Sequence, residues 1–206
     1  MCAAARRCVE GSCPLIGCDV MEGCLIIHPM DSVCASEIMQ WAYDGPYSRY
    51  NLGSGDMDEL LNGSYFAAFD HLEKLIGFFC FGMAAQVPAG NRLGHYYEDS
   101  LLDIGLGMAP PLCGQGRGLA FLRDGMKWAY HKFRPKGFRL TVAAFNHRAI
   151  LVYERAGFEK ASLFECDTGG QVTEFWVMRC QEYNQKDQHT GSSTSYTVAP
   201  TNPGPP

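Results

Sequence analysis

The chain has 206 residues, a formal net charge of −5 and a hydrophobic content of 47%. These values fit one globular domain with a substantial core. They exclude a general attraction to nucleic acid or to an anionic membrane, although a basic small substrate such as an amine would not be repelled. No segment is long and apolar enough to span a bilayer, and the start of the chain has no apolar signal-peptide core, so we expect a cytoplasmic protein.

Composition divides the chain into three parts. Five of the ten cysteines lie in the first 24 residues, at spacings of five or six that differ from those of zinc sites, so we expect free thiols and no metal. Residues 1–20 are predicted to be a loosely ordered, cysteine-rich extension, and residues 21–182 to form the domain. Residues 183–206 are polar and rich in proline, which predicts a disordered tail.

The first half of the domain alternates strand and helix patterns. Asp31 or Ser32 can cap the first helix, and Gly45-Pro46 interrupts the chain after that helix. The expected elements are, in order, a strand at 24–28, a helix at 33–43, a short helix at 56–61, a hairpin of strands at 65–69 and 74–83, and a polar loop at 84–99.

Four aromatic residues lie in or beside the interruption after the first helix: Trp41, Tyr43, Tyr47 and Tyr50. Two interpretations stay open. The tyrosines can simply pack on the domain, or the rings can form a wall around an amine and hold a cationic or apolar group against their faces.

The central stretch, residues 101–120, combines a strand, a glycine-rich turn and the start of a helix. The strand at 101–108 ends at Pro110-Pro111, because proline cannot donate to a ladder. Glycine then occupies every second position from Gly114 to Gly118, before a helix expected at 119–131. Glycines let backbone N–H groups converge, and the N–H groups of the first helical turn point at the same spot, so this stretch predicts an anion-binding cradle.

Two common nucleotide-binding patterns do not fit this turn. A P-loop needs Lys-Ser or Lys-Thr after its glycines, and neither pair is present. The dinucleotide pattern GxGxxG needs a glycine where Leu119 or Phe121 stands, counted from Gly114 and Gly116 respectively.

The last part of the domain is expected to contain a strand at 138–144, a helix at 148–156, and strands at 158–166 and 171–180 joined through Gly169-Gly170. Asn146 can cap the helix, and Gly157 suits the position that ends it. Together the elements predict an α/β (α+β) fold, a mixed sheet of about six to seven strands flanked by helices.

Two motifs in this order resemble the GNAT superfamily of N-acetyltransferases. The register of its motif P-x-x-(Arg/Gln)-G-x-G-x-(Gly/Ala) is matched by Pro110, Gly114, Gly116 and Gly118, with Cys113 at the Arg/Gln position. Its second motif, N-x-x-A-x-x-x-Y-x-x-x-G-F, is matched by Asn146, Ala149, Tyr153, Gly157 and Phe158. The resemblance runs from about residue 24 to residue 180. It implies a fold in which the central strand splays from the following one to admit an acyl-pantetheine arm.

The resemblance also implies acetyl-CoA as co-substrate and assigns roles to individual residues. The main chain of Leu106 and Met108 would hold the pantetheine and the thioester, Asn146 would orient the pantetheine arm, and Tyr153 would protonate the leaving sulfur. The residues implied to bind the pyrophosphate are Gly114, Gln115, Gly116, Arg117, Gly118 and Leu119.

Transfer to an amine also needs a group that takes the amine's proton, either a carboxylate or an ordered water. Asp103 lies on the central strand, where several GNAT enzymes carry an acid, and would act through water; the strand could equally point it away from the cleft. Glu98 and Asp99 are further candidates, and His95 is a base by its chemistry, although a loop histidine is more often solvated.

The resemblance therefore implies an enzyme that moves an acetyl group from acetyl-CoA to a primary amine, in a small molecule or at a peptide N-terminus, by direct transfer in a ternary complex. An acyl-CoA-binding sensor or scaffold without catalysis is the alternative, and another phosphate ligand is a third reading. Tyr153 favours the enzyme, because binding alone needs no proton donor at the sulfur. A homodimer through the last strands would be in keeping with the superfamily.

Overall fold

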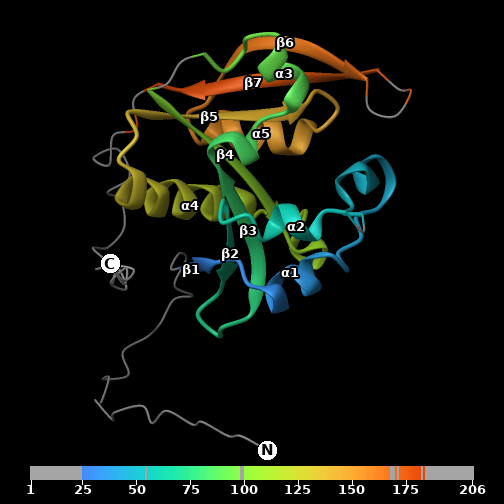
Figure 1. Ribbon diagram of the computed structural model, residues 1–206. Coiled ribbons are helices and arrows are strands. Elements are labelled where there is room, and N and C mark those ends of the chain that lie inside the picture. The colour runs from blue at the N-terminus through green and yellow to red at the C-terminus, as the bar shows by residue number, and fades with distance from the viewer. Residues whose placement is uncertain are drawn as a thin grey trace, which may run out of the picture.

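The computed structural model describes residues 25–53, 55–97, 100–167, 170, 172–181 and 183. Within these residues, seven strands form one sheet with helices on both of its faces (Figure 1). The predicted domain limits stay predictions, because the extension at 1–20 and all but one residue of the tail at 183–206 lie outside the described residues.

The sheet is mixed, as the sequence predicts. Its strand order is β1-β2-β3-β4-β5-β7-β6, and among neighbouring strands only β4 and β5 run parallel. A parallel pair needs a crossover connection, which the helix α4 (Gly118–Phe133) supplies. The strands are β1 (Ile26–Pro29), β2 (Tyr65–Phe69), β3 (Leu75–Phe81), β4 (Leu101–Met108), β5 (Gly137–Ala143), β6 (Glu159–Asp167) and β7 (Val172–Cys180).

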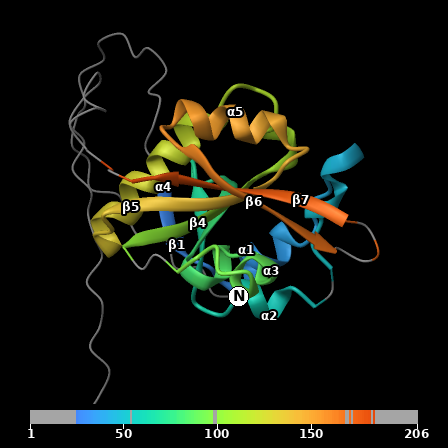
Figure 2. The ribbon, with the colours of Figure 1, turned by 90° about the horizontal axis from the view of Figure 1, so that it is seen from above.

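The helices form two layers, one on each face of the sheet (Figure 2). α4 (Gly118–Phe133) and α5 (His147–Arg155) share one face, and α1 (Ser32–Ile38), α2 (Met57–Leu60) and α3 (Pro88–Arg92) lie on the other. Short 3-10 helices are η1 (Gly45–Tyr50), η2 (Gly82–Ala85) and η3 (Pro110–Leu112). None of the helices in the described ranges is both long and apolar enough to cross a membrane.

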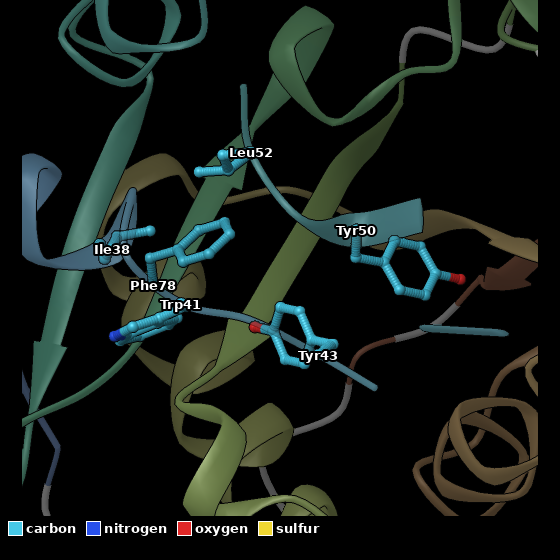
Figure 3. A pocket seen from close by; sticks show the side chains of 6 residues that line it. All are labelled: Ile38, Trp41, Tyr43, Tyr50, Leu52 and Phe78. Atoms are coloured by element: carbon cyan, nitrogen blue, oxygen red, sulfur yellow. The ribbon is translucent and has the colours of Figure 1, made fainter. Parts of the chain in front are cut away.

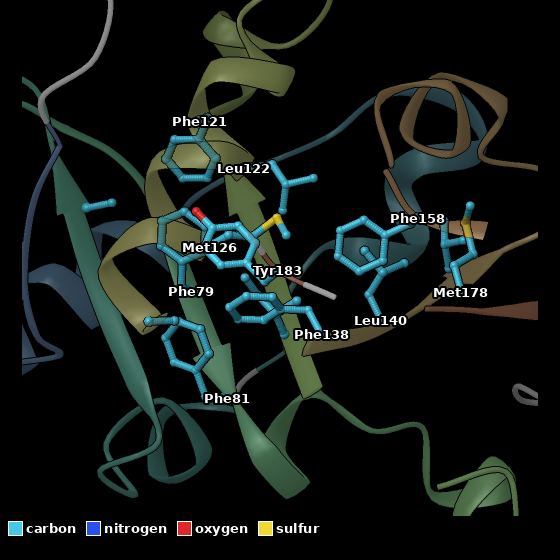
Figure 4. Packing of buried hydrophobic residues seen from close by; sticks show 14 of the residues in the cluster. Phe79, Phe81, Phe121, Leu122, Met126, Phe138, Leu140, Phe158, Met178 and Tyr183 are labelled. Carbon is cyan, nitrogen blue, oxygen red and sulfur yellow. The ribbon is translucent and has the colours of Figure 1, made fainter. Parts of the chain in front are cut away.

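The alternating side chains of β3 contribute to both apolar layers. Phe79 and Phe81 belong to the cluster that includes α4, where Phe79 stacks on Phe121 with 4.6 Å between ring centroids (Figure 4). Phe78 and Cys80 face the other way and pack with residues of α1 and α2. The sheet is therefore held between two apolar layers at its centre, where the site lies.

The first helix is shorter than predicted. Asp31 caps it as expected, because its Oδ1 accepts a hydrogen bond from the Cys34 N–H at 2.8 Å. Helix α1 nevertheless ends at Ile38 rather than near residue 43. Trp41 instead packs beside Phe78 of β3, with 6.2 Å between the ring centroids, so tertiary packing replaces the last helical turn.

The polar loop predicted at 84–99 is partly helical, and this prediction was wrong. α3 begins with Pro88, whose missing N–H is not needed in the first turn of a helix. Gly90 lies so close to neighbouring rings that a Cβ atom there would be 2.8 Å from both Phe164 and Tyr96. A helix of this length leaves little periodicity in the sequence, and packing against β6 stabilises it instead.

The predicted ends of α5 are confirmed. The Asn146 Oδ1 accepts a hydrogen bond from the Ala149 N–H at 3.2 Å, which caps the helix. Gly157 follows the last turn with a φ of 95°, the left-handed conformation that glycine adopts most easily. The hairpin expected after this helix is present as the antiparallel pair β6 and β7. Residues 168, 169 and 171 of its turn lie outside the described residues.

Candidate active site

β4 and β5 separate partway along their length, and the candidate site surrounds this separation (Figure 1). The paired residues are Leu101 with Gly137, Leu102 with Phe138 and Asp103 with Arg139. Beyond them β4 continues to Met108, while β5 continues to Ala143 in register with β7. The second half of β4 therefore has an open edge where β5 would otherwise pair with it.

The backbone groups at this open edge belong to Leu106 and Met108. The Ala109 N–H donates to the Ile76 carbonyl of the neighbouring strand segment at 2.9 Å. Hydrogen-bonded and non-hydrogen-bonded pairs alternate in an antiparallel ladder, so the odd-numbered residues of β4 bond to β3 and the even-numbered ones face β5. The main-chain roles predicted for Leu106 and Met108 require this orientation.

Gly105 and Gly107 lie on the face of β4 that is turned away from α4. This face therefore carries no side chains near the end of the strand. A Cβ atom on Gly105 would overlap the Cys80 sulfur, and one on Gly107 would overlap the ring of Phe78. Glycine is therefore required at both positions, because it lets the side chains of β3 lie directly over the end of β4.

Asp103, the first candidate for the general base, is held in a buried ion pair at the point of separation. Its Oδ1 accepts a hydrogen bond from Arg139 Nε at 2.6 Å, and its Oδ2 accepts from Arg139 Nη2 and from Gln86 Nε2, both at 2.7 Å. The exposed fractions are 4% for Asp103 and 2% for Arg139. This geometry argues against the predicted base role, because the carboxylate could reach an amine or its water only by breaking the ion pair.

The glycine-rich turn has the open form that an anion cradle needs. Gly114 and Gly116 both have a φ of 78°, in the left-handed region. Residues 114–117 are exposed, and no atom lies within 4 Å of the place where a Gly116 Cβ would be. Helix α4 then begins at Gly118 without a side-chain cap, so no described side chain caps the N–H groups of its first turn.

Cys113 stands where the superfamily motif has Arg or Gln. Its thiol donates to the carbonyls of Met108 and Ala109, with sulfur–oxygen distances of 3.6 and 3.8 Å. Burial raises the pKa of Cys113, and the nearby Arg148 guanidinium opposes this only in part. The thiol therefore stays protonated near neutral pH, which does not suit a nucleophile.

α5 borders both the turn and the start of α4. A Cβ on Gly118 would lie 3.4 Å from Val152 Cγ2, and one on Gly114 would lie 3.6 Å from Arg148 Nη1. The Arg148 guanidinium also lies over the ring of Tyr47, 4.2 Å from its centroid, and this contact helps to hold it beside the turn. A positive charge is thus present next to the turn although Cys113 supplies none.

Asn146, Tyr153 and Tyr50 lie together where α5 meets the segment after α1. The Asn146 Nδ2 donates to the Tyr50 hydroxyl at 3.2 Å, while the Oδ1 of the same side chain caps α5. Burial raises the pKa of Tyr153 well above its ordinary value, and the nearby Tyr50 phenol adds to this rise. Tyr153 therefore stays protonated at neutral pH, as a proton donor must.

A narrow pocket lies beside the end of β4 on the face away from α4 (Figure 3). Its cavity volume is about 10 Å³, room for about one water molecule, and it is partly open to solvent. The side chains that line it come from α1, from the segment after α1 and from β3, and all of them are uncharged: Ile38, Trp41, Tyr43, Tyr50, Leu52 and Phe78. Three of the four aromatic residues singled out in the sequence thus share one pocket wall.

Tyr43 joins this wall to the open edge of β4. Its hydroxyl donates to the Met108 carbonyl at 2.9 Å, and burial raises its pKa, which keeps the hydroxyl a donor. Tyr47, the fourth aromatic residue, does not line the pocket and packs near Phe145, with 6.2 Å between the ring centroids. The pocket therefore opens next to the residues predicted to hold the thioester.

Of the remaining candidate bases only His95 is described, and it does not join this group. The His95 Nδ1 lies 2.9 Å from the Ser162 hydroxyl, and its ring stacks on Phe164 of β6. Glu98 and Asp99 lie outside the described residues, as do the five N-terminal cysteines. In the part of the chain that the structure describes, the cysteines are free thiols, and no group of three or more His, Cys, Asp or Glu is placed to hold a metal ion.

Sequence reasoning missed Arg139 and Gln86 as partners of Asp103, and Phe78 as a pocket residue. A signal for Arg139 was present, because Asp103 and Arg139 are the only charged residues in two apolar strand patterns. Opposite charges in two buried strands predict an ion pair. The pocket had no such signal, since Phe78 looks like any other apolar residue of β3.

A mixed sheet whose parallel central pair separates beside a glycine-rich turn is the fold of N-acetyltransferases. A GNAT-family acetyltransferase from Bacillus anthracis has a TM-score of 0.59 and 12% sequence identity, over 77% of this chain and 95% of that chain. A chimera of the spermidine N-acetyltransferase SpeG from Vibrio cholerae and hSSAT has a TM-score of 0.59 and 16% identity, over 76% and 95%. AAC(6')-Ib in complex with ribostamycin and coenzyme A has a TM-score of 0.59 and 16% identity, over 82% and 99%.

The family follows from the sequence itself. The model of the acetyltransferase (GNAT) family matches residues 34–158, which is more than half of the chain. The chain therefore belongs to this family and is an acyltransferase, which confirms the resemblance drawn from its two motifs. No similar sequence is found among the curated proteins.

Proposed function

We propose that this chain moves an acetyl group from acetyl-CoA to a primary amine by direct transfer in a ternary complex. The observation that carries the proposal is the separation of β4 from β5 next to the glycine-rich turn, with Tyr153 on the helix that borders the same turn. These features give a diphosphate, a pantetheine arm and a leaving sulfur separate sets of partners.

The described residues fit coenzyme A. The exposed turn and the uncapped start of α4 offer converging N–H groups to a diphosphate, through Gly114, Gln115, Gly116, Arg117, Gly118 and Leu119. Arg148 adds the positive charge that position 113 lacks. The open edge of β4 can bond the amides of a pantetheine arm much as a further strand would, and Asn146 can orient that arm from the other side of the gap.

Acetyl-CoA supplies the activated acetyl group, and the protein has three tasks in the transfer. An N–H at the open edge of β4 polarises the thioester carbonyl. Tyr153, kept protonated by its burial, gives its proton to the departing sulfur. The aromatic residues beside Met108 border the side from which the nitrogen of the acceptor approaches the carbonyl carbon.

We propose that ordered water, rather than Asp103, takes the proton of the amine. Both oxygens of Asp103 are bound in the ion pair, and among the described residues no acid or histidine lines the pocket. Burial raises the pKa of Tyr43 and of Tyr50, so both hydroxyls stay protonated at neutral pH and are not available as bases. Water at the open mouth can pass the proton to solvent.

The test is a screen of amines and peptides with acetyl-CoA, read as release of free thiol. The Gly116→Asp variant serves as the blank, because a side chain and a negative charge at this position should exclude the diphosphate. Thiol release that depends on the acceptor and is lost in the variant supports the proposal. A protein that binds CoA in calorimetry yet releases no thiol with any acceptor would be a binding module instead. A small-molecule or peptide acceptor, the cytoplasmic location and a homodimer stay predictions.

A further inference from the structure

We infer that Tyr50 competes with acetyl-CoA for the Asn146 amide, so that the cofactor binds by displacing Tyr50 and opening the loop that carries it. This inference rests on the proposed function, because it uses the role proposed for Asn146 in orienting the pantetheine arm. It comes from the contacts of one loop, residues 43–51, which we call the flap.

The flap is closed at its base. The Asn51 Oδ1 accepts a hydrogen bond from the Tyr43 N–H at 2.7 Å, and the Asn51 Nδ2 donates to the Tyr43 carbonyl at 3.4 Å. The Tyr43 hydroxyl in turn donates to the Met108 carbonyl at 2.9 Å. The base of the flap is therefore fixed on the β4 side of the gap.

The rest of the flap makes contacts on the other side of the gap. The Tyr50 hydroxyl, which points away from that of Tyr43, accepts from Asn146 Nδ2 at 3.2 Å (Figure 3). The Arg49 Nη1 donates to the Thr173 Oγ1 of β7 at 2.6 Å. The flap therefore spans the gap from the β4 side to the side of α5 and β7.

Two groups that hold the flap are also groups that coenzyme A needs. Asn146 is proposed to orient the pantetheine arm, and Tyr50 already occupies its Nδ2. Arg148 lies over the Tyr47 ring, 4.2 Å from the centroid, and beside the glycine-rich turn. A diphosphate carries formal negative charge, so it attracts this guanidinium more strongly than a ring face does. The cofactor and the flap therefore compete for both groups.

Tyr50 also lies close to the proposed proton donor. The Tyr50 phenol is near enough to Tyr153 to contribute to its raised pKa. The sulfur of acetyl-CoA is expected beside Tyr153, and the pantetheine arm beside Asn146. Displacement of the one Tyr50 side chain would therefore free the places of both.

The flap can open at a small cost in free energy. Five of the six residues of η1 are exposed, and Tyr47 is half-buried. Tyr50 itself is 39% exposed, so water can replace its hydrogen bond to Asn146. Gly45 has a φ of 60° and no described atom within 4 Å of a Cβ there, which leaves room for the chain to turn. A segment with so few buried contacts opens easily.

Tyr50→Phe tests the inference, because it removes the hydroxyl that binds Asn146 and keeps the ring. We expect the dissociation constant of CoA, measured by calorimetry, to fall about two- to tenfold, the factor to which one hydrogen bond corresponds. Tyr97→Phe is the matched control, because Tyr97 is 81% exposed and follows α3, and it should leave the CoA affinity as it is. A Tyr50 hydroxyl that only stabilised the fold, or that helped to bind the cofactor, would leave the constant unchanged or raise it. Either result in a folded Tyr50→Phe variant would overturn the inference.

A second variant asks whether the competition acts through Asn146. Asn146→Ser removes the Nδ2 donor and keeps an oxygen that can cap α5. In this background Tyr50→Phe should no longer improve CoA binding. The same improvement with Ser as with Asn at position 146 would contradict the competition for the amide.

Hydrogen exchange followed by mass spectrometry separates this inference from the proposed function. CoA should slow the exchange of amides at 114–119, where the diphosphate is expected, and speed it at 45–50, because the flap opens. If exchange slows at 114–119 but does not speed up at 45–50, the cofactor site stands and the flap inference falls. If CoA affects neither segment, the cofactor site falls. The flap is then judged without CoA, since Tyr50→Phe alone should speed exchange at 45–50, and an unchanged rate would contradict it.

Discussion

Asp103 of β4 and Arg139 of β5 are the last pair in the parallel ladder, and two hydrogen bonds of 2.6 and 2.7 Å join their side chains. The two strands separate directly beyond them. The Arg139 guanidinium also lies over the Tyr96 ring, 5.0 Å from its centroid. This ring covers another side of the ion pair. The pair therefore fixes the point at which the gap between the strands begins.

Removing one partner of this ion pair should destabilise the fold. Asp103→Asn should lower the free energy of unfolding by about 3 kcal/mol or more, because the buried Arg139 guanidinium would lose the negative charge of this carboxylate. Urea denaturation followed by circular dichroism measures this change. A loss of less than about 1 kcal/mol, the size of one ordinary hydrogen bond, would mean that the pair contributes little.

Replacing both partners separates the structural role of Asp103 from a catalytic one. The double variant Asp103→Leu, Arg139→Met should recover much of the lost stability, because apolar side chains can fill the space of a buried pair without its desolvation cost. Thiol release should then persist at a measurable rate. A stable double variant that binds CoA but shows no turnover would return Asp103 to the mechanism as the base.

Tyr153→Phe removes the proposed proton donor and keeps the ring. We expect kcat to fall by about 10²-fold, the low end of what general acid catalysis contributes, while the dissociation constant of acetyl-CoA stays the same. Steady-state kinetics and calorimetry measure the two quantities. Unchanged turnover would remove Tyr153 from the mechanism, and a parallel loss of acetyl-CoA affinity would point to a binding role.

The pH profile gives a second test of Tyr153. The protonated phenol is the active form, and a pKa raised above the ordinary tyrosine value of about 10 keeps that form present as the pH rises. The alkaline decline of kcat should therefore begin above about pH 10, within the range where the fold persists by circular dichroism. A decline centred below about pH 9 that disappears in Tyr153→Phe would contradict the raised pKa.

Gly116→Asp should abolish CoA binding and leave the fold intact. The φ of 78° costs a non-glycine residue about 1–2 kcal/mol, but the space around the new Cβ is open. Gly63→Asp is the matched control, because Gly63 has a φ of 87° and equally open surroundings in a loop away from the turn. Calorimetry with CoA should show normal binding for the control alone. Tight binding by Gly116→Asp would refute this position for the diphosphate.

Tyr43→Phe should loosen the pocket wall. It removes the hydrogen bond to the Met108 carbonyl, worth about 0.5–1.5 kcal/mol, so the KM of the acceptor should rise roughly two- to tenfold with little change in acetyl-CoA affinity. Tyr47→Phe, outside the pocket, should leave both values as they are. An equal effect of the two substitutions would show that the hydrogen bond of Tyr43 does not position the acceptor.

The features that the sequence determined by itself are local ones. Asp31 and Asn146 cap their helices, Gly157 ends α5, and Gly114 and Gly116 lie in the predicted glycine-rich turn, both in the left-handed conformation. A cap or a tight turn is specified within a few neighbouring residues, so its signal survives without knowledge of the rest of the chain. The alternation of strand and helix patterns likewise predicted the mixed sheet.

The features that only the tertiary structure decided are contacts between distant segments. The end of α1 at Ile38, the ion pair that occupies Asp103, and the pocket shared by Trp41, Tyr43, Tyr50 and Phe78 all arise where separate elements meet. The physical reason is that burial and pairing free energies depend on which groups come together in space. The sequence alone does not tell whether the carboxylate of Asp103 faces a substrate or an arginine. The register of β4 against β5 decides this, because it places Asp103 beside Arg139.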